Sequence, residues 1–188
     1  MRRKTAQSLC WLGMGLAVTV TGVAVAAAAD GKASEAPPLQ TVGKVDLQRY
    51  LGTWYEIARY PNRFERSCDS DTTAQYSFRP DGRIEVVNAC RKPNGGTKSV
   101  RGVAKVVEPE TNAKLKVTFF WPFSGDYWVV MLDPEYRYAV VGEPRRKYLW
   151  VLSRTPRLDP ETYNTILNRI GQLGYIPSKL VATQQSNR

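Results

Sequence analysis

The residues of this sequence that could do chemistry are few: three cysteines, a strand-borne carboxylate at Glu56 and no histidine. Cys68 and Cys90 flank two stretches, 72–78 and 83–89, whose alternation is typical of a hairpin. Two thiols in an oxidising compartment favour one disulfide, which would stabilise the fold by roughly 3 kcal/mol. A reactive or metal-binding cysteine pair is the alternative, and the lack of histidine argues against it. We therefore expect a structural Cys68–Cys90 disulfide, with no metal and no cofactor.

The first 29 residues have the three parts of a secretory signal. A basic start at residues 2–4 is followed by an apolar stretch at 12–25 and by alanines at 27–29. We expect cleavage before Asp30, which places the protein in the periplasm or outside the cell, with outer-membrane association as a further option.

An uncleaved membrane anchor is the alternative for this segment, because no charge interrupts residues 11–29. Lipid attachment would need a cysteine directly after the apolar stretch. Cys10 precedes that stretch, so a lipoprotein anchor is not expected.

Composition after the signal indicates one domain. Residues 30–43 are rich in alanine, proline and small polar residues and are expected to form a flexible leader, with 183–188 as a tail. The formal net charge is +10, and its densest cluster lies at 145–147. That cluster is either a solvated turn or a contact with anionic lipid. No nucleic-acid motif accompanies the charge, so a nucleic-acid partner is not expected.

Alternation of apolar and polar residues predicts about eight short strands followed by one helix. Consecutive antiparallel strands in this number can close into a barrel that holds one small ligand. The helix, near 160–173, begins at the N-cap Asp159 and presents an apolar stripe that should pack on the outside of the barrel. The strands are placed near residues 53–60, 72–79, 83–91, 99–107, 113–121, 126–132, 137–142 and 147–153.

Period-two parity assigns side chains to the barrel interior. The assigned set is apolar and aromatic with a few polar tips, which suits an amphiphile with its tail deep and its head near the opening. The alternative is that these side chains fill the barrel. For Glu56, pairing inside the protein and contact with a ligand are both open. The expected ligand-binding residues are Glu56, Ala58, Tyr60, Tyr76, Asn88, Val117, Phe119, Tyr127, Val129, Tyr148 and Trp150.

Three motifs, at 52–60, 132–138 and 149–156, resemble those of the lipocalins, and within them the bacterial outer-membrane and apolipoprotein D branches. The resemblance covers 44–182, the expected lipocalin domain, and implies an all-β, eight-stranded antiparallel up-and-down barrel with one C-terminal helix outside it. It also implies that Arg154 lies on the Trp54 indole, a contact worth about 2 kcal/mol. The second motif departs from the usual Thr-Asp-Tyr pattern. The implied closed-end cluster comprises Gly52, Trp54, Asp133, Tyr136 and Arg154.

These features favour a non-enzymatic carrier of fatty acids, lysophospholipids or similar amphiphiles in the cell envelope. A lipocalin-type isomerase or synthase and a pigment carrier are the alternatives, but the chain lacks histidine and paired inward carboxylates. The segment 121–123 is expected to pack on the barrel and would touch a membrane surface if exposed. We expect a monomer or a homodimer.

Overall fold

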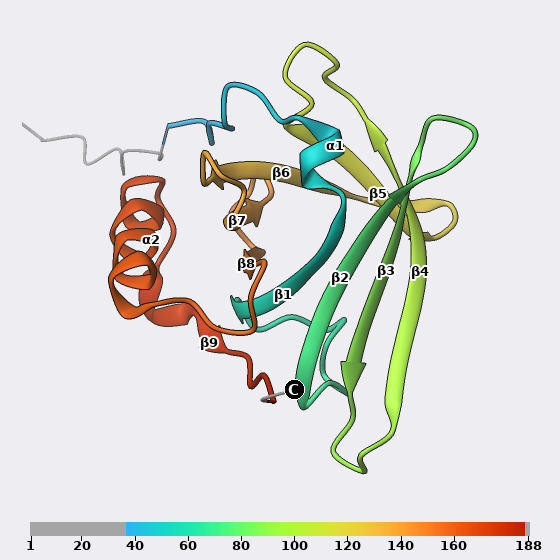
Figure 1. Ribbon diagram of the computed structural model, residues 1–188. Helices are drawn as coiled ribbons and strands as arrows, with labels where there is room; N and C mark the ends of the chain where they lie inside the picture. Colours follow the sequence, from blue (N-terminus) through green and yellow to red (C-terminus); the bar gives the residue numbers. More distant parts are fainter. Residues whose placement is uncertain (1–36, 187–188) are drawn as a thin grey trace, which may run out of the picture. The chain divides into compact units, whose positions relative to one another are not determined.

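The computed structural model describes residues 37–186 and contains each predicted strand within a few residues of its expected bounds (Figure 1). Each strand pairs antiparallel with the next along the chain, and β1 pairs with both β2 and β8, so the sheet closes on itself. The predicted all-β barrel is therefore confirmed. The strands are β1 (Gly52–Arg59), β2 (Ser70–Phe78), β3 (Ile84–Arg91), β4 (Thr97–Val106), β5 (Lys114–Phe120), β6 (Phe123–Leu132), β7 (Tyr138–Gly142) and β8 (Leu149–Ser153).

A short helix that sequence periodicity did not reveal, α1 (Leu47–Tyr50), covers one end of the barrel. Asp46 caps it by accepting hydrogen bonds from the backbone N–H groups of Gln48 and Arg49. The chain then passes directly into β1, so β1, β3, β5 and β7 all start at this covered end. We call it the closed end, and the opposite end, which carries the turns after those strands, the open end.

Two separate hydrophobic cores follow from the alternation. Inward side chains, among them Trp54 and Val129, fill the barrel together with residues of α1. Outward side chains of β1, β7 and β8 pack under α2 (Pro160–Gln172), whose Ile166 and Ile170 are completely buried. Figure 1 shows α2 lying outside the barrel, next to β7 and β8. The predicted outer helix is therefore confirmed.

A β-bulge in β1 reverses the parity that the sequence predicted for its second half. Glu56 lies opposite Leu152, but the register then shifts, so that Ala58 lies opposite Val151 and both belong to the outer core. Tyr60 also lies outside, where its hydroxyl bonds with the backbone of Ile176. The expectation that Ala58 and Tyr60 line the interior is wrong, because one extra residue moves every later side chain to the other face.

The C-terminal segment is part of the sheet. After the 3₁₀ turn η1 (Pro177–Lys179), strand β9 (Val181–Ala182) pairs with Ala58 and Arg59 of β1. Beyond the expected domain boundary, Gln184 forms a bridge with Ser70. At the other terminus, within the expected leader, the Leu39 side chain is buried in the outer core.

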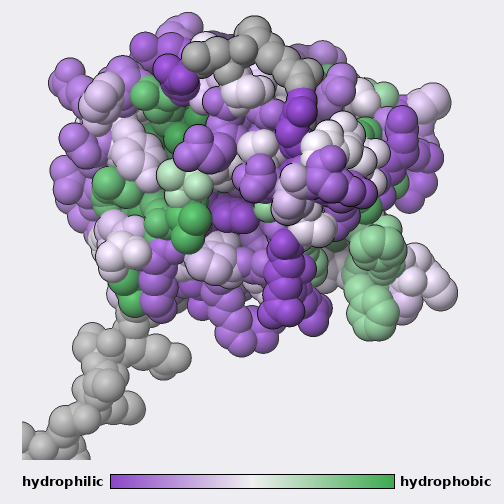
Figure 2. Space-filling view, turned by 90° about the horizontal axis from the view of Figure 1, so that it is seen from below, coloured by the Kyte–Doolittle hydropathy of each residue, from purple (hydrophilic) through white to green (hydrophobic). Residues whose placement is uncertain are grey.

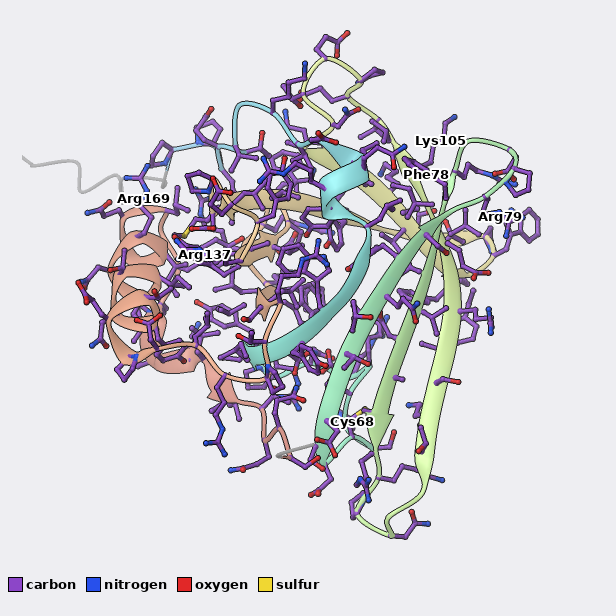
Figure 3. The ribbon with its side chains drawn as sticks, viewed as in Figure 1. Cys68, Phe78, Arg79, Lys105, Arg137 and Arg169 are labelled. Carbon is purple, nitrogen blue, oxygen red and sulfur yellow. A yellow bond between two sulfur atoms is a disulfide. The ribbon has the colours of Figure 1, made fainter. Side chains whose placement is uncertain are left out.

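The predicted disulfide is present: Cys68 and Cys90 are bonded, with their Cα atoms 5.6 Å apart. Figure 3 shows Cys68 at the lower end of β2 and β3, opposite the end where Phe78 and Arg79 lie. Within residues 37–186 no helix is long and apolar enough to cross a bilayer. The expected signal or anchor at 1–29 lies outside the described residues.

Candidate ligand-binding site

Three tyrosine hydroxyls meet inside the closed half of the barrel. Tyr127 of β6 bonds with Tyr50 of α1 at 2.8 Å and with Tyr76 of β2 at 2.9 Å. Burial raises the pKa of Tyr76 to about 12 and raises the pKa of the other two phenols as well. All three therefore stay neutral at physiological pH and act as hydrogen-bonding groups rather than as bases.

Next to these phenols, apolar side chains surround a void of about 10 Å³, which has room for about one water molecule. Drug-sized ligands occupy pockets of roughly 300–1,000 Å³, so this part of the interior is filled as it stands. The lining residues are Val45, Leu47, Tyr50, Leu51, Tyr76, Ile84, Ala104, Leu115, Val117, Tyr127 and Val129.

The expected motif residues gather at the closed end and do structural work there. The Arg154 guanidinium lies 3.8 Å from the centroid of the Trp54 indole, as the resemblance implied. Gly52 has φ +91°, and a Cβ there would meet Arg154 Nη1 at 3.4 Å, so this position favours glycine. The Tyr136 hydroxyl accepts a hydrogen bond from the Asp46 backbone N–H. In the β6–β7 turn, the Asp133 carboxylate accepts one from the backbone N–H of Glu135.

A cluster of charged groups lies toward the open end, where β1 finishes. Glu56 projects inward and is 3 % exposed, and Arg59, brought inward by the bulge, has its Nε 3.5 Å from Glu56 Oε1. Glu65, from the loop after β1, accepts hydrogen bonds from Arg59 Nε at 2.8 Å, Trp150 Nε1 at 2.9 Å and Asn62 Nδ2 at 3.0 Å. Two carboxyl groups thus share one arginine in a mostly buried site.

Glu65 is the better hydrogen-bonded carboxyl group of this pair, because it accepts from three N–H donors. Burial raises the pKa of Glu56 to about 9, and the neighbouring Glu65 charge acts in the same direction. The Thr183 hydroxyl, which donates to Glu56, opposes the shift. At neutral pH Glu56 is therefore a neutral carboxylic acid, able to donate as well as accept a hydrogen bond.

Asn88 adds an unsatisfied polar atom to the same interior. It lies opposite Ala74 on β2, which faces inward, and its Oδ1 is buried without a hydrogen-bond donor. At the rim, Tyr148 stacks on Trp150 with ring centroids 5.9 Å apart and contacts Phe64 at 5.6 Å. A buried acceptor without a partner costs free energy unless another molecule supplies the donor.

Parity placed most of the expected binding residues on the inner face. It missed Tyr50, Arg59 and Glu65, since Tyr50 lies outside the strands, Arg59 depends on the bulge and Glu65 is in a loop. The spacing of Leu47 and Tyr50 after a capping aspartate is the one signal that could have revealed α1. Those on the inner face or its rim are Glu56, Tyr76, Asn88, Val117, Phe119, Tyr127, Val129, Tyr148 and Trp150.

A family model described as a lipocalin-like domain matches residues 45–185, three quarters of the chain. The chain is a lipocalin. It is 44 % identical over 155 residues to the outer membrane lipoprotein Blc of Escherichia coli K12, covering 81 % of this chain and 87 % of that protein. It is 35 % identical over 161 residues to apolipoprotein D of Mus musculus, covering 80 % of this chain and 82 % of that protein.

Solved structures agree with this assignment. Insecticyanin from the tobacco hornworm Manduca sexta superposes on this lipocalin with a TM-score of 0.67, covering 81 % of this chain and 87 % of that one. At 22 % identity this likeness establishes the fold alone. Family membership supports the binding of small hydrophobic molecules, lipids included.

Proposed function

We propose that this lipocalin is a carrier that holds one single-chain lipid amphiphile in the barrel, with the acyl chain toward the closed end. The observation that carries the proposal is the segregation of the interior. Apolar side chains and neutral phenols occupy the closed half, and the charged cluster of Glu56, Arg59 and Glu65 lies toward the open end. An acyl tail and a polar head fit that arrangement in one orientation.

The charges of the cluster favour one class of head group. With Glu56 protonated, the charges of Glu65 and Arg59 balance each other. A ligand carboxylate would compete with Glu65 for the same arginine, whereas an ammonium or hydroxyl group can donate to Glu65 or to Asn88 Oδ1. We therefore infer a preference for lysophosphatidylethanolamine over a free fatty acid.

Entry of the tail requires movement of side chains. The closed-half void is far smaller than an acyl chain, so the ligand must displace Tyr127 and its neighbours from their present positions. Each methylene buried contributes about 0.8 kcal/mol, enough for roughly micromolar affinity once binding costs are subtracted.

We further infer that the protein works outside the cytoplasm, cleaved before Asp30, in the envelope or the medium. The Cys68–Cys90 disulfide and the signal-like first 29 residues support this location. The mass of the protein recovered from the producing cell tests the cleavage: loss of 1–29 supports it, and an intact N-terminus contradicts it.

Native mass spectrometry and displacement of a fluorescent fatty acid test the carrier. We expect one lipid per chain, with lysophosphatidylethanolamine displacing the probe at lower concentration than oleate. The matched variants are Ala74→Leu, which fills the inner face of β2, and Gln75→Leu, which adds the same side chain to its exposed outer face. Ala74→Leu should weaken binding about tenfold or more, and Gln75→Leu should leave it unchanged.

Thermal unfolding of both variants shows that each is folded before the affinities are compared. Failure of the wild-type protein to bind either lipid would overturn the proposal. Equal effects of Ala74→Leu and Gln75→Leu on lipid affinity would place the ligand outside the barrel and would also overturn the proposal.

A further inference from the structure

The turn between β5 and β6 presents a cluster of aromatic side chains to solvent. Phe120 and Phe123 lie opposite each other at the end of the hairpin, and they are 70 % and 78 % exposed. Trp121, in the turn itself, is 88 % exposed. The expectation that this segment packs on the barrel is therefore wrong. Figure 2 shows that the surface seen from below is mostly hydrophilic, with hydrophobic groups confined to separate patches. We call Phe120, Trp121 and Phe123 the aromatic tip.

A groove on the outside of the barrel continues from this tip. Its volume is about 920 Å³, and Trp121 forms part of its wall together with residues of β3, β4 and β5, most of which face outward. The groove runs along these strands to the β2–β3 turn at the closed end. Figure 3 shows two of its cations, Arg79 and Lys105, at that end of the sheet. The cationic side chains that line the groove are Arg79, Arg83, Arg101, Lys105 and Lys116.

Carboxylates compensate some of these cations but not all. Asp81 pairs with Arg83 at 2.6 Å, Glu85 with Arg101 at 3.2 Å, and Asp126 with Lys116 at 3.2 Å. Lys105 makes no ion pair with any described residue, and it lies directly opposite Lys116 on β5. Five cations facing three carboxylates leave the groove with an excess of positive charge.

We propose that the aromatic tip and the adjoining groove form a docking surface for a phospholipid bilayer. Tryptophan and phenylalanine side chains partition into the interface between head groups and acyl chains. A two-stranded tip is narrow, so it would bury little area against a flat protein face but can enter the head-group layer. The excess cations of the groove then face lipid phosphates, and binding is stronger when the lipid carries net negative charge.

The position of the tip relates docking to the candidate lipid site. The β5–β6 turn lies at the open end and the groove continues from it along β4 and β5, so docking places this side of the barrel, its open end included, against the bilayer. The docking surface itself shares no residue with the charged cluster of Glu56, Arg59 and Glu65. Docking can therefore fail while the interior still binds lipid, and the reverse also holds.

Vesicle co-sedimentation tests the proposal with two compositions: phosphatidylcholine alone, and equimolar phosphatidylcholine and phosphatidylglycerol. The wild-type protein should bind both and should prefer the mixed vesicles, a preference that about 0.5 M salt abolishes. Phe120→Ser, Trp121→Ser and Phe123→Ser combined should weaken binding to both compositions by about tenfold or more. The matched control is Val181→Ser, which removes another exposed apolar side chain, on β9.

Charge variants separate the two parts of the surface. Lys105→Gln combined with Lys116→Gln should reduce binding to the mixed vesicles about tenfold and leave binding to phosphatidylcholine vesicles unchanged. Lys179→Gln, an exposed lysine on η1, should change neither. Displacement of the fluorescent fatty acid checks that the tip and charge variants keep the interior site.

Unchanged vesicle binding of the tip variant overturns the proposal, as does a wild-type protein that binds neither composition. Sedimentation velocity tests the alternative that the aromatic tip binds a second copy of the chain. A wild-type dimer that the tip variant converts to a monomer, without vesicle binding by either, would assign the tip to dimerisation instead.

Discussion

The Thr183 hydroxyl donates a hydrogen bond to the buried carboxyl group of Glu56, which stands 127 positions earlier in the chain. Gln185 of the same segment donates from Nε2 to the backbone carbonyls of Glu56 and Thr72, at 2.8 and 2.9 Å. Direct pairing of β1 with β2 runs from Gly52 to Tyr55 and then stops. The C-terminal segment therefore supplies hydrogen bonds where β1 and β2 separate, next to the charged cluster.

Replacement of Glu56 by glutamine should make stability less sensitive to pH. In the unfolded chain Glu56 releases its proton near pH 4.5, whereas the folded protein holds it until about pH 9. Between these values the folded state binds more protons, so the free energy of unfolding falls as pH rises, by at most about 1.4 kcal/mol per pH unit from this group. Urea unfolding at intervals from pH 5 to 9 measures the slope.

Glu56→Gln keeps the size of the side chain and its acceptor for Thr183, so the variant should gain stability relative to the wild-type protein as pH rises. Glu161→Gln, an exposed glutamate on α2, is the control and should reproduce the wild-type slope. Parallel pH profiles for the wild-type protein and Glu56→Gln would show that Glu56 is already ionised in the folded state.

Gln185→Ala should destabilise the protein by about 1–2 kcal/mol, because two part-buried carbonyls lose their side-chain donor. Gln184→Ala is a matched control one residue away, since the Gln184 side chain is exposed and its bonds use the backbone. Denaturant unfolding compares the two variants. Equal free energies of unfolding would mean that Gln185 contributes no net stability.

Elements of this structure can be predicted from the sequence where a periodic pattern of apolar residues is long enough to be recognised. Strand order and the inward direction of Tyr76 and Asn88 follow from alternation repeated over the nine residues of β2 and the eight of β3. The outer helix follows from its capping aspartate and its apolar stripe. The bulge that moves Ala58 outward is one residue in length and leaves no periodic signal. Strand β9 has two residues, too few to show a period.

The charged cluster could not be predicted for a related reason. Glu65 belongs to a loop, and its contact with Trp150 spans 85 positions, which no local pattern encodes. The exposure of the aromatic tip also differs from the expectation, because hydrophobicity alone favours burial for Trp121. The hairpin geometry leaves that turn without a surface to pack on.

Arg154→Lys should lower the free energy of unfolding by about 1–3 kcal/mol although the charge is kept. The guanidinium lies on Trp54 and also donates to the backbone carbonyls of Thr53 at 2.9 Å and Arg49 at 2.6 Å. An ammonium group cannot stack on the indole as a plane while it reaches both carbonyls. Denaturant unfolding at neutral pH measures the loss.

Arg157→Lys is the matched control, because Arg157 is exposed and three residues further along the same chain segment. The Arg49 carbonyl belongs to α1, so loss of its donor should also loosen the cover of the closed end. Faster hydrogen exchange at the Tyr50 and Leu51 N–H groups, which close α1, would report this directly. If Arg154→Lys unfolds like Arg157→Lys, the planar contact with Trp54 adds nothing beyond charge, and the closed end is held by its apolar packing.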